Sequence, residues 1–303
     1  MRITQSMIAR MGLDQLSMQR NRLARTQEQA ATGLRINRPS DDPVDYRTTL
    51  HLKDSLSQTG RFLRSIDLAR TRFRTTEEAI SDSIQVVSNA KVTAIAAGNT
   101  SNSGSSSRAA LKTQVEQLFD RLLSLSNSKA PGGGYVFSGR VSDTAPFVQA
   151  GSFVSGSPPP TVTFAGDASV IQVEIDEGVY VDVTRDGSQV YQGTVDVFST
   201  LGDLWTGIDQ DDPLAIQTAI GELDQALDQM LVEQSQIGGS EAKADAFEER
   251  LRLQEQEFAS QISFLEDADA FEVYSDLAAQ ETALQASLQV TSRLLTPTLL
   301  DFI

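Results

Sequence analysis

The sequence predicts a mainly α protein with an inserted β domain, built as an elongated rod of nested antiparallel long helices that bears a small β tip. Apolar residues recur at alternating steps of three and four through residues 62–97, 111–125, 216–265 and 274–295, a spacing typical of coiled coils and helical bundles. Residues 135–200 instead hold short β-branched segments separated by turn residues, which indicates strands. One helix over 216–265 would be roughly 75 Å long at about 1.5 Å per residue, whereas a globule of this chain length is only ~50 Å across. The length of this helix therefore favours a rod.

The N-terminal helix is expected to stop within ATGLRINRPSDDP, residues 31–43. Gly33 takes the left-handed conformation of a helix cap at little cost, and Pro39 cannot continue a helix. A residue of the Ser-Asp-Asp segment can cap the next helix, and Pro43 suits its first turn, because that position needs no amide donor. The pattern predicts a joint between two helices.

The helical pattern resumes after the joint and is interrupted by a polar segment from Gly98 to Ser107. Five later segments read as strands, namely YVFSG, TVTFAG, VIQVEI, VYVDVT and QVYQGTVDVF. Residues 198–205 are expected to form a short helix that leads back to the longest helical stretch. Gly238 and Gly239 lie inside that stretch, but a helical Gly costs only about 1 kcal/mol, so we expect the helix to continue through both.

Pairing of the first helix with the last, and of the inner helices with each other, predicts three domains. These are a terminal helical assembly domain (1–42 and 266–303), a helical rod domain (43–134 and 208–265) and an inserted β domain (135–207). The seam of the terminal domain consists of leucines at helical spacing: Leu16, Leu23, Leu277, Leu284, Leu288 and Leu295. Two helices of this length, paired only with each other, are marginally stable. Their exposed faces favour packing against other copies of the chain.

Charge is unevenly distributed along the chain. The first 140 residues hold 20 of the 25 basic and 12 of the 41 acidic residues, so their net charge is +8 against −24 for the remainder. A basic region can indicate nucleic acid or an acidic partner, but no groove-reading motif or aromatic stacking pattern accompanies it. We therefore expect no nucleic acid, and expect the basic half to meet the chain's own acidic half or a neighbouring copy.

The chain offers few reactive groups for catalysis. It has no Cys, and its single histidine, His51, lies in a predicted helix without a nucleophile motif. The Gly-rich PGGGY at 131–135 lacks the Gly-Lys-Ser/Thr of a phosphate loop. DQDDP at 209–213 resembles the start of a calcium loop, but Leu214 and Ile220 stand where Gly and Glu are required. We predict that the protein is no enzyme and needs no cofactor and no metal.

The N-terminal stretch MRITQSMIARMGLDQLSMQR contains no apolar run as long as a signal-peptide core. We therefore expect neither a cleaved signal nor a membrane span there. The absence of Cys fits a cytosolic protein and also an exported one that needs no oxidation. Export without cleavage stays compatible with this stretch.

The segment TGLRINRPSDDP resembles the bacterial flagellin family, whose N-terminal region carries Gly-x-Arg-Ile-Asn followed by Ser-Asp-Asp-Pro. The matching positions are Gly33, Arg35, Ile36, Asn37, Ser40, Asp41, Asp42 and Pro43. Two other stretches, GGGYVFSGRVSDTAPF and LQASLQVTSRLLTPTLLDFI, are more similar to the hook-filament junction branch of that family (hook-associated protein 3) than to flagellin. The resemblance covers residues 1–147 and 216–303, with departures from the family pattern at 30–32, 45–46 and 296–298.

This resemblance implies a structural protein of the bacterial flagellum that joins hook to filament, exported through the flagellar type III pathway to the outside of the cell. It implies as partners other copies of the chain, the hook-side junction protein, flagellin and a flagellar export chaperone, with no membrane partner. The terminal helices would line an inner tube, the joint would lead the chain to a middle shell, and the β domain would face outward. Two alternatives stay open: a filament-forming flagellin, and a cytosolic coiled-coil scaffold with stably folded ends.

Overall fold

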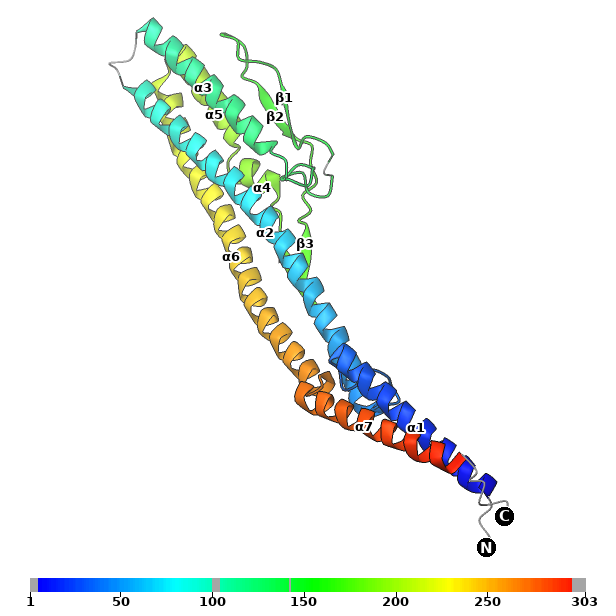
Figure 1. Cartoon of the computed structure of the whole chain (residues 1–303). Coiled ribbons are helices and arrows are strands. Elements are labelled where there is room, and N and C mark those ends of the chain that lie inside the picture. The colour runs from blue at the N-terminus through cyan, green and yellow to red at the C-terminus, as the bar shows by residue number, and fades with distance from the viewer. Residues whose placement is uncertain (1–4, 100–103, 142, 296–303) are drawn as a thin grey trace, which may run out of the picture. The chain divides into compact units, whose positions relative to one another are not determined.

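The structure, a computed structural model, describes residues 5–99, 104–141 and 143–295, and it is mainly helical (Figure 1). Its elements in chain order are α1 (Gln5–Thr32), α2 (Pro43–Gly98), α3 (Ser105–Ser126), β1 (Phe147–Ala150), β2 (Thr161–Phe164), β3 (Gln172–Asp176), β4 (Val179–Asp182), α4 (Gly187–Gln192), α5 (Val197–Gln210), α6 (Pro213–Glu266) and α7 (Ala270–Leu295). The described residues form two compact units. The first takes in the chain up to Thr59 and from Leu253 onward, and the second is Gly60–Arg252.

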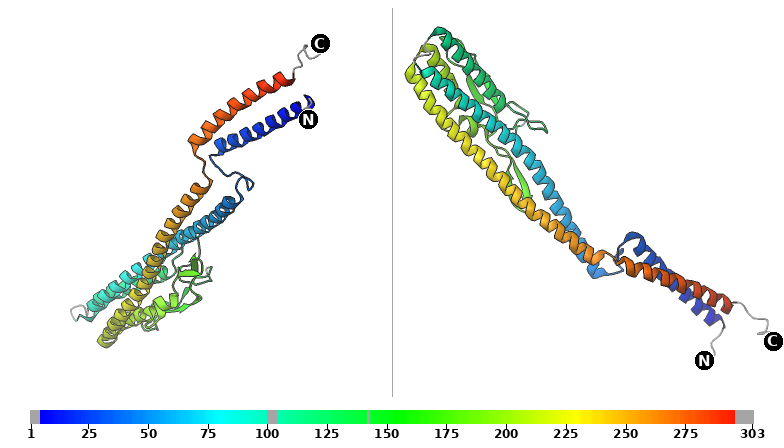
Figure 2. Two further views of the ribbon diagram at one scale, coloured as in Figure 1. Left: turned by 90° about the horizontal axis from the view of Figure 1, so that it is seen from below. Right: turned by 60° about the vertical axis from the view of Figure 1, so that its left-hand side comes forward.

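In the first unit, α1 and α7 lie side by side and antiparallel (Figures 1 and 2). Gly12 lies next to Thr291 at one end of this pair, since a Cβ at Gly12 would come 3.7 Å from the Thr291 side chain. Towards the other end, the Thr26 hydroxyl donates to Gln280 Oε1 at 3.1 Å. The predicted pairing of the first helix with the last is confirmed.

In the second unit, α2 and α6 lie side by side, and α3 packs on α5 (Figures 1 and 2). α6 is a single helix of 54 residues that continues through Gly238 and Gly239, as the sequence predicts. Asp212 begins it by accepting hydrogen bonds from Leu214 N and Ala215 N at 2.9 and 3.3 Å, so the acidic segment before α6 caps a helix. The predicted fold class, mainly α with nested antiparallel helices and a small β region, is confirmed.

The β region consists of two separate antiparallel pairs. β1 pairs with β2 from Phe147↔Phe164 to Ala150↔Thr161. β3 pairs with β4 from Gln172↔Asp182, with an irregularity between Glu174 and Asp176. The three predicted segments TVTFAG, VIQVEI and VYVDVT supply β2, β3 and β4, while β1 lies in a stretch for which no strand was predicted.

The other two predicted strands are wrong. YVFSG forms turns, and its consecutive residues Val136 and Phe137 are both buried, whereas a half-buried strand would alternate. QVYQGTVDVF belongs to α4 and to the beginning of α5. Asp186 and Asp196 explain this difference, because their side chains accept hydrogen bonds from the first amides of these two helices.

Aromatic residues form the core where these elements meet. Phe147 lies 5.2 Å from Tyr191 and 5.6 Å from Phe198, measured between ring centroids, and Phe119 lies 5.5 Å from Phe198. The Tyr191 hydroxyl lies 2.9 Å from Ser83 Oγ on α2, and burial raises the pKa of Tyr191. This core fixes α3, α4, α5 and β1 onto the long helices.

The basic and acidic halves of the chain meet in ion pairs. Arg70 bonds to Asp245 at 2.5 Å and to Glu248, and Lys91 bonds to Asp224, in each case between α2 and α6. Lys112 of α3 lies 2.6 Å from Asp209 of α5. The expectation that the basic half meets the chain's own acidic half is therefore confirmed for these side chains.

Candidate assembly interface

The joint between α1 and α2 folds as its local sequence predicts. α1 ends at Thr32, and Gly33 follows with a φ of +72°, a left-handed conformation that Gly adopts without steric penalty. α2 begins at Pro43, and the Asp42 carboxylate accepts hydrogen bonds from Val44 N and Asp45 N, both at 3.1 Å. The hydrogen bond from the Asp45 amide is the main reason that the pKa of Asp42 is lowered. Asp42 is therefore the cap of α2.

Arg35 fastens this joint to the end of α6. Its Nη2 donates to Asp45 Oδ2 and to the carbonyl oxygen of Leu265, each at 2.7 Å. Its backbone amide donates to the carbonyl oxygen of Glu266 at 2.6 Å. A single side chain and its own amide thus hold three segments of the first unit together.

The other signature residues close the joint on itself. Ile36 is 2% exposed, and it is the one buried apolar residue among the described residues of the first unit. Asn37 Nδ2 donates to the Leu34 carbonyl at 3.0 Å, and the Asp41 carboxylate accepts from Arg38 N at 2.9 Å. Ser40 is exposed.

The charged side chains of the joint are paired within the chain. Arg38 donates to both carboxylate oxygens of Glu28 at 2.9 and 3.0 Å, and Arg35 bonds to Asp45 as described above. Each of the two arginines therefore has a carboxylate partner within the first unit.

Glu266 is a functional candidate that the sequence did not reveal. It is only 7% exposed, and Lys53 Nζ lies 2.7 Å from its Oε1 and 2.6 Å from its Oε2. Its backbone carbonyl also accepts the bond from Arg35 N. Because these partners are more than 200 residues away along the chain, no local pattern marked Glu266.

The predicted terminal seam is only partly buried. Leu16, Leu23, Leu277 and Leu284 are half-buried between α1 and α7, and Leu288 is 42% exposed. The side chain of Leu295 lies outside the described residues. Gln19 Oε1 is buried in this seam without a hydrogen-bond partner among the described residues, an arrangement that costs about 1–3 kcal/mol.

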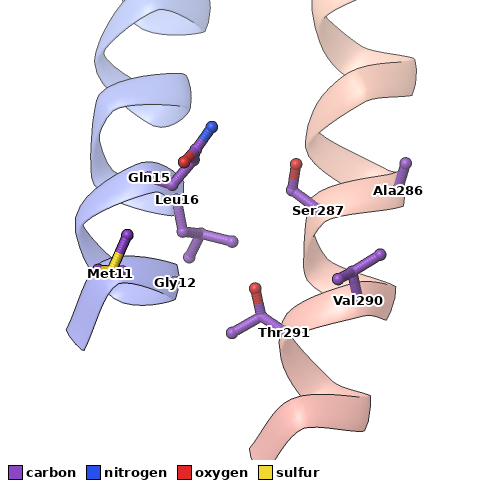
Figure 3. Close-up of a pocket in the computed structure, with 8 residues that line it drawn as sticks. All are labelled: Met11, Gly12, Gln15, Leu16, Ala286, Ser287, Val290 and Thr291. Atoms are coloured by element: carbon purple, nitrogen blue, oxygen red, sulfur yellow. The ribbon is translucent and has the colours of Figure 1, made fainter. Parts of the chain in front are cut away.

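The two units differ sharply in burial. Where the structure describes their side chains, α1 and α7 contain no fully buried apolar residue, whereas α2 and α6 bury Phe73, Ile80, Leu223 and Met230 in the second unit. An open groove of about 400 Å³ runs between α1 and α7 (Figure 3). Its lining consists of Met11, Gly12, Gln15, Leu16, Ala286, Ser287, Val290 and Thr291. The terminal pair thus leaves apolar surface uncovered, which in a soluble monomer marks a site of interaction.

Reactive groups are dispersed by contrast. Within the part of the chain that the structure describes, no three His, Cys, Asp or Glu side chains gather in a way that could hold a metal ion. His51 is exposed on α2. No helix of the described ranges has the length and apolar character needed to cross a membrane.

Two family models match the chain over most of its length. The model of the bacterial flagellin N-terminal helical region matches residues 3–142, and that of the bacterial flagellin C-terminal helical region matches residues 220–303. The chain belongs to the bacterial flagellin family.

Within this family, two curated relatives are named flagellar hook-associated protein 3. The one from Escherichia coli is 24% identical over 274 residues, which is 86% of each chain. The one from Salmonella typhimurium is 26% identical over 191 residues, or 63% of this chain and 57% of that one. Flagellin B of Helicobacter pylori is 26% identical over 129 residues, but the match covers only 42% of this chain and 25% of that one.

Solved structures share the fold. A putative flagellar hook-associated protein from Vibrio parahaemolyticus superposes with a TM-score of 0.66 at 18% identity, covering 75% of this chain and 99% of that one. The flagellar junction protein FlgL from Legionella pneumophila superposes with a TM-score of 0.60 at 16% identity, covering 73% and 100%.

Proposed function

We propose that this protein is a hook-filament junction subunit of the bacterial flagellum, a structural protein needed for filament attachment and motility. The observation that carries the proposal is the incomplete burial of α1 and α7, joined to the match with hook-associated protein 3 over 86% of both chains. A pair of helices that buries so little of its own apolar surface gains stability by packing among sister molecules. No catalytic step is part of this role.

The two units divide the work in this proposal. The second unit supplies a rigid body, because it contains the fully buried aromatic and aliphatic core. The first unit supplies the assembly surfaces, α1 and α7, and the joint held by Arg35, Ile36 and Asp42 keeps the chain's direction fixed where α1 gives way to α2. The 135–207 region faces outward from the assembled tube.

The proposed partners follow from the same role. Copies of the chain form the junction zone, the hook-side junction protein lies on one side and flagellin on the other. An export chaperone binds the C-terminal amphipathic helix before assembly. Export occurs through the flagellar type III pathway without cleavage, so the protein resides outside the cell.

A filament-forming flagellin is the second candidate, since Flagellin B is also a relative. The low coverage of that relative favours the junction role, because the E. coli hook-associated protein is matched along 86% of its length. Purified flagellin would polymerise into long filaments, whereas a junction subunit would not. A cytosolic scaffold would instead show folded, protected ends in solution.

Deletion of the gene in its own host tests the proposal. We expect intact hooks, flagellin released into the medium and no attached filaments by electron microscopy, with attachment restored by the full chain on a plasmid. Filaments that remain attached in the deletion strain would exclude the junction role. Loss of filament protein itself from both cells and medium would point to flagellin.

A further inference from the structure

Three of the chain's five methionines lie exposed along one flank of α1. Met7, Met11 and Met18 are 56%, 63% and 55% exposed. Their spacing of four and seven residues places them on one side of the helix. Arg25 continues this row after another seven residues. We call Met11, Met18 and Arg25 the α1 row.

The α1 row lies directly beside the seam. The residue that follows each member of the α1 row is packed against α7. These following residues are Gly12, Gln19 and Thr26. Met11 forms one edge of the open groove in Figure 3, with Ala286 and Val290 on the opposite edge. The α1 row therefore faces the groove side of the helix pair.

A second row with the same spacing lies on α7. Tyr274, Glu281 and Leu288 are exposed and also recur every seven residues. Each member of this α7 row comes one residue after a half-buried position, whereas Ala286, at the groove edge, comes one residue before such a position. One residue corresponds to a rotation of about 100° around the helix axis. Residues before and after a half-buried position therefore lie on opposite sides of the helix pair, and the α7 row lies on the side away from the groove.

The two rows complement each other when the helices run antiparallel. When α1 of one copy lies antiparallel to α7 of another, Met11 meets Leu288 and Arg25 meets the Tyr274 ring. Met18 and the neighbouring Arg22 then meet Glu281. Among the described residues, Arg22, Arg25 and Glu281 make no ion pair, so each charge is available for a partner. Met11 would thus face the apolar Leu288, and Arg22 would face the carboxylate of Glu281. The Arg25 guanidinium would face an aromatic ring, a favourable cation–π arrangement.

We propose that the α1 row is a docking surface for the α7 row of a second copy of this chain. This inference rests on the proposed junction role and specifies the contact by which its copies meet. Because the two rows lie on opposite sides of the helix pair, each copy offers one row to each of two neighbours. Such a heterologous contact builds a ring or a helix and not an isolated pair.

The composition of the α1 row gives the contact a chemical sensitivity. Exposed thioethers are open to peroxide, which transfers one oxygen atom to sulfur to give the sulfoxide and is itself reduced to water. A sulfoxide is polar, and burying it against Leu288 without a hydrogen-bond partner would weaken the contact about ten-fold. The surface is therefore also a modification site at which oxidation weakens assembly.

The chain has no Cys, so engineered disulfides report the contact directly. We would express full-length Met11→Cys/Leu288→Cys in the deletion strain, isolate hook-filament particles and oxidise them. We expect a ladder of covalent multimers on a non-reducing gel. The matched control, Leu13→Cys/Leu288→Cys, places both thiols on the side away from the groove and should give no ladder. A ladder from the control alone, or a disulfide to a protein of another mass, would overturn the proposal.

A charge exchange tests the same contact without thiols. Arg22→Glu and Glu281→Arg should each reduce the number of attached filaments, by about two- to five-fold for an exposed pair, and the double exchange should restore it. Failure of the double variant to exceed both single variants would contradict the contact. The junction role is judged separately, from the deletion strain and the unaltered chain. A result in which the unaltered chain restores filaments, yet neither ladder nor rescue appears, removes this inference alone.

Peroxide supplies a third measurement. Treating the purified full chain before reassembly on filamentless hooks should lower attachment, and Met11→Leu/Met18→Leu should resist the treatment. Equal sensitivity of the double variant and the unaltered chain would show that the α1 row is not where peroxide acts.

Discussion

Lys53 and Glu266 join the first part of α2 to the last residue of α6, with Lys53 Nζ 2.7 and 2.6 Å from the two carboxylate oxygens. The carboxylate is almost buried while the lysine is half-exposed. Lys53→Met would leave that carboxylate without its cation. We expect the free energy of unfolding to fall by about 1–2 kcal/mol. This is less than for a fully buried pair, because solvent reaches the lysine. Hydrogen exchange of residues 263–268 measures it, and Asp54→Asn, at an exposed neighbour, should leave their exchange unchanged.

Arg35 should contribute more than Arg38 to the stability of the joint between α1 and α2. The Arg35 side chain bonds to a carboxylate and a backbone carbonyl, whereas the Arg38 side chain bonds to Glu28 and is 65% exposed. Arg35→Ala should therefore speed amide exchange around residues 34–36 by about ten-fold, while Arg38→Ala should change it by less than about three-fold. Equal effects of the two changes would contradict the role given to Arg35.

Alanine should act in opposite directions at different glycines. Gly238 and Gly239 are helical with open space around them, so Ala there should raise the free energy of unfolding by about 1 kcal/mol each. Gly33 also has open space, but its φ is +72°, so Gly33→Ala should lower it by about 1 kcal/mol through backbone strain alone. Thermal unfolding of the three variants measures these changes. Because a Cβ at any of the three positions meets open space, a lower stability of Gly33→Ala would come from backbone strain and not from crowding.

The pairing of α2 with α6 should weaken in acid. Hydrogen bonds from Arg70 and Arg252 hold the pKa of Glu248 below its ordinary value of 4.5. A carboxyl group with a lowered pKa in the folded state stabilises the fold above 4.5 and loses that contribution as the pH falls through the folded value. Glu248→Gln should thus lower Tm at neutral pH, and the difference from the unaltered chain should shrink below pH 4.5. Glu249→Gln, at an exposed neighbour, is the control and should show no such convergence.

Asp203 should behave in the opposite way. Burial first, and then the charges of Glu222 and Asp196, raise its pKa. Its ionised form therefore opposes folding, and stability should increase as the pH falls through the raised value. Asp203→Asn should raise Tm at neutral pH and have little effect in acid. A lower Tm at neutral pH would show that the carboxylate contributes a favourable contact.

Proteases should attack the terminal helices first. α1 presents Arg20, Arg22 and Arg25 to solvent on a helix without a fully buried apolar side chain among those described. Trypsin should therefore cleave the isolated chain there well before it cleaves Arg121 in α3, whose helix buries Phe119 and Leu122. Mass spectrometry of a short digest gives the order of cleavage. Comparable protection of both helices would argue for a stably folded terminal pair.

Local patterns in the sequence were sufficient for the long helices and the joint. The spacing of apolar residues predicts α2 and α6, and Gly33 and Pro43 stand within one residue of the observed helix ends. These features depend on residues close together in the chain, where propensity and capping act. The position of Leu16 and Leu277 between α1 and α7 follows from the same spacing.

Strand prediction was weaker for a physical reason. QVYQGTVDVF alternates as a strand would, but Asp186 and Asp196 cap helices there, and Tyr191 is buried by aromatic neighbours distant in sequence. Likewise, the Lys53–Glu266 pair joins residues 213 positions apart. Contacts of this kind are decided by packing, which a local pattern does not contain.

The separation of charge along the chain has a consequence for protein synthesis. Arg70 bonds to Asp245, which lies 175 residues further along the chain, and Lys91 bonds to Asp224, which lies 133 residues further along. A nascent chain that has grown to residue 200 does not yet contain the α6 partners of these two cations. The packing of α2 beside α6 can therefore form only after translation has delivered residues 213–266.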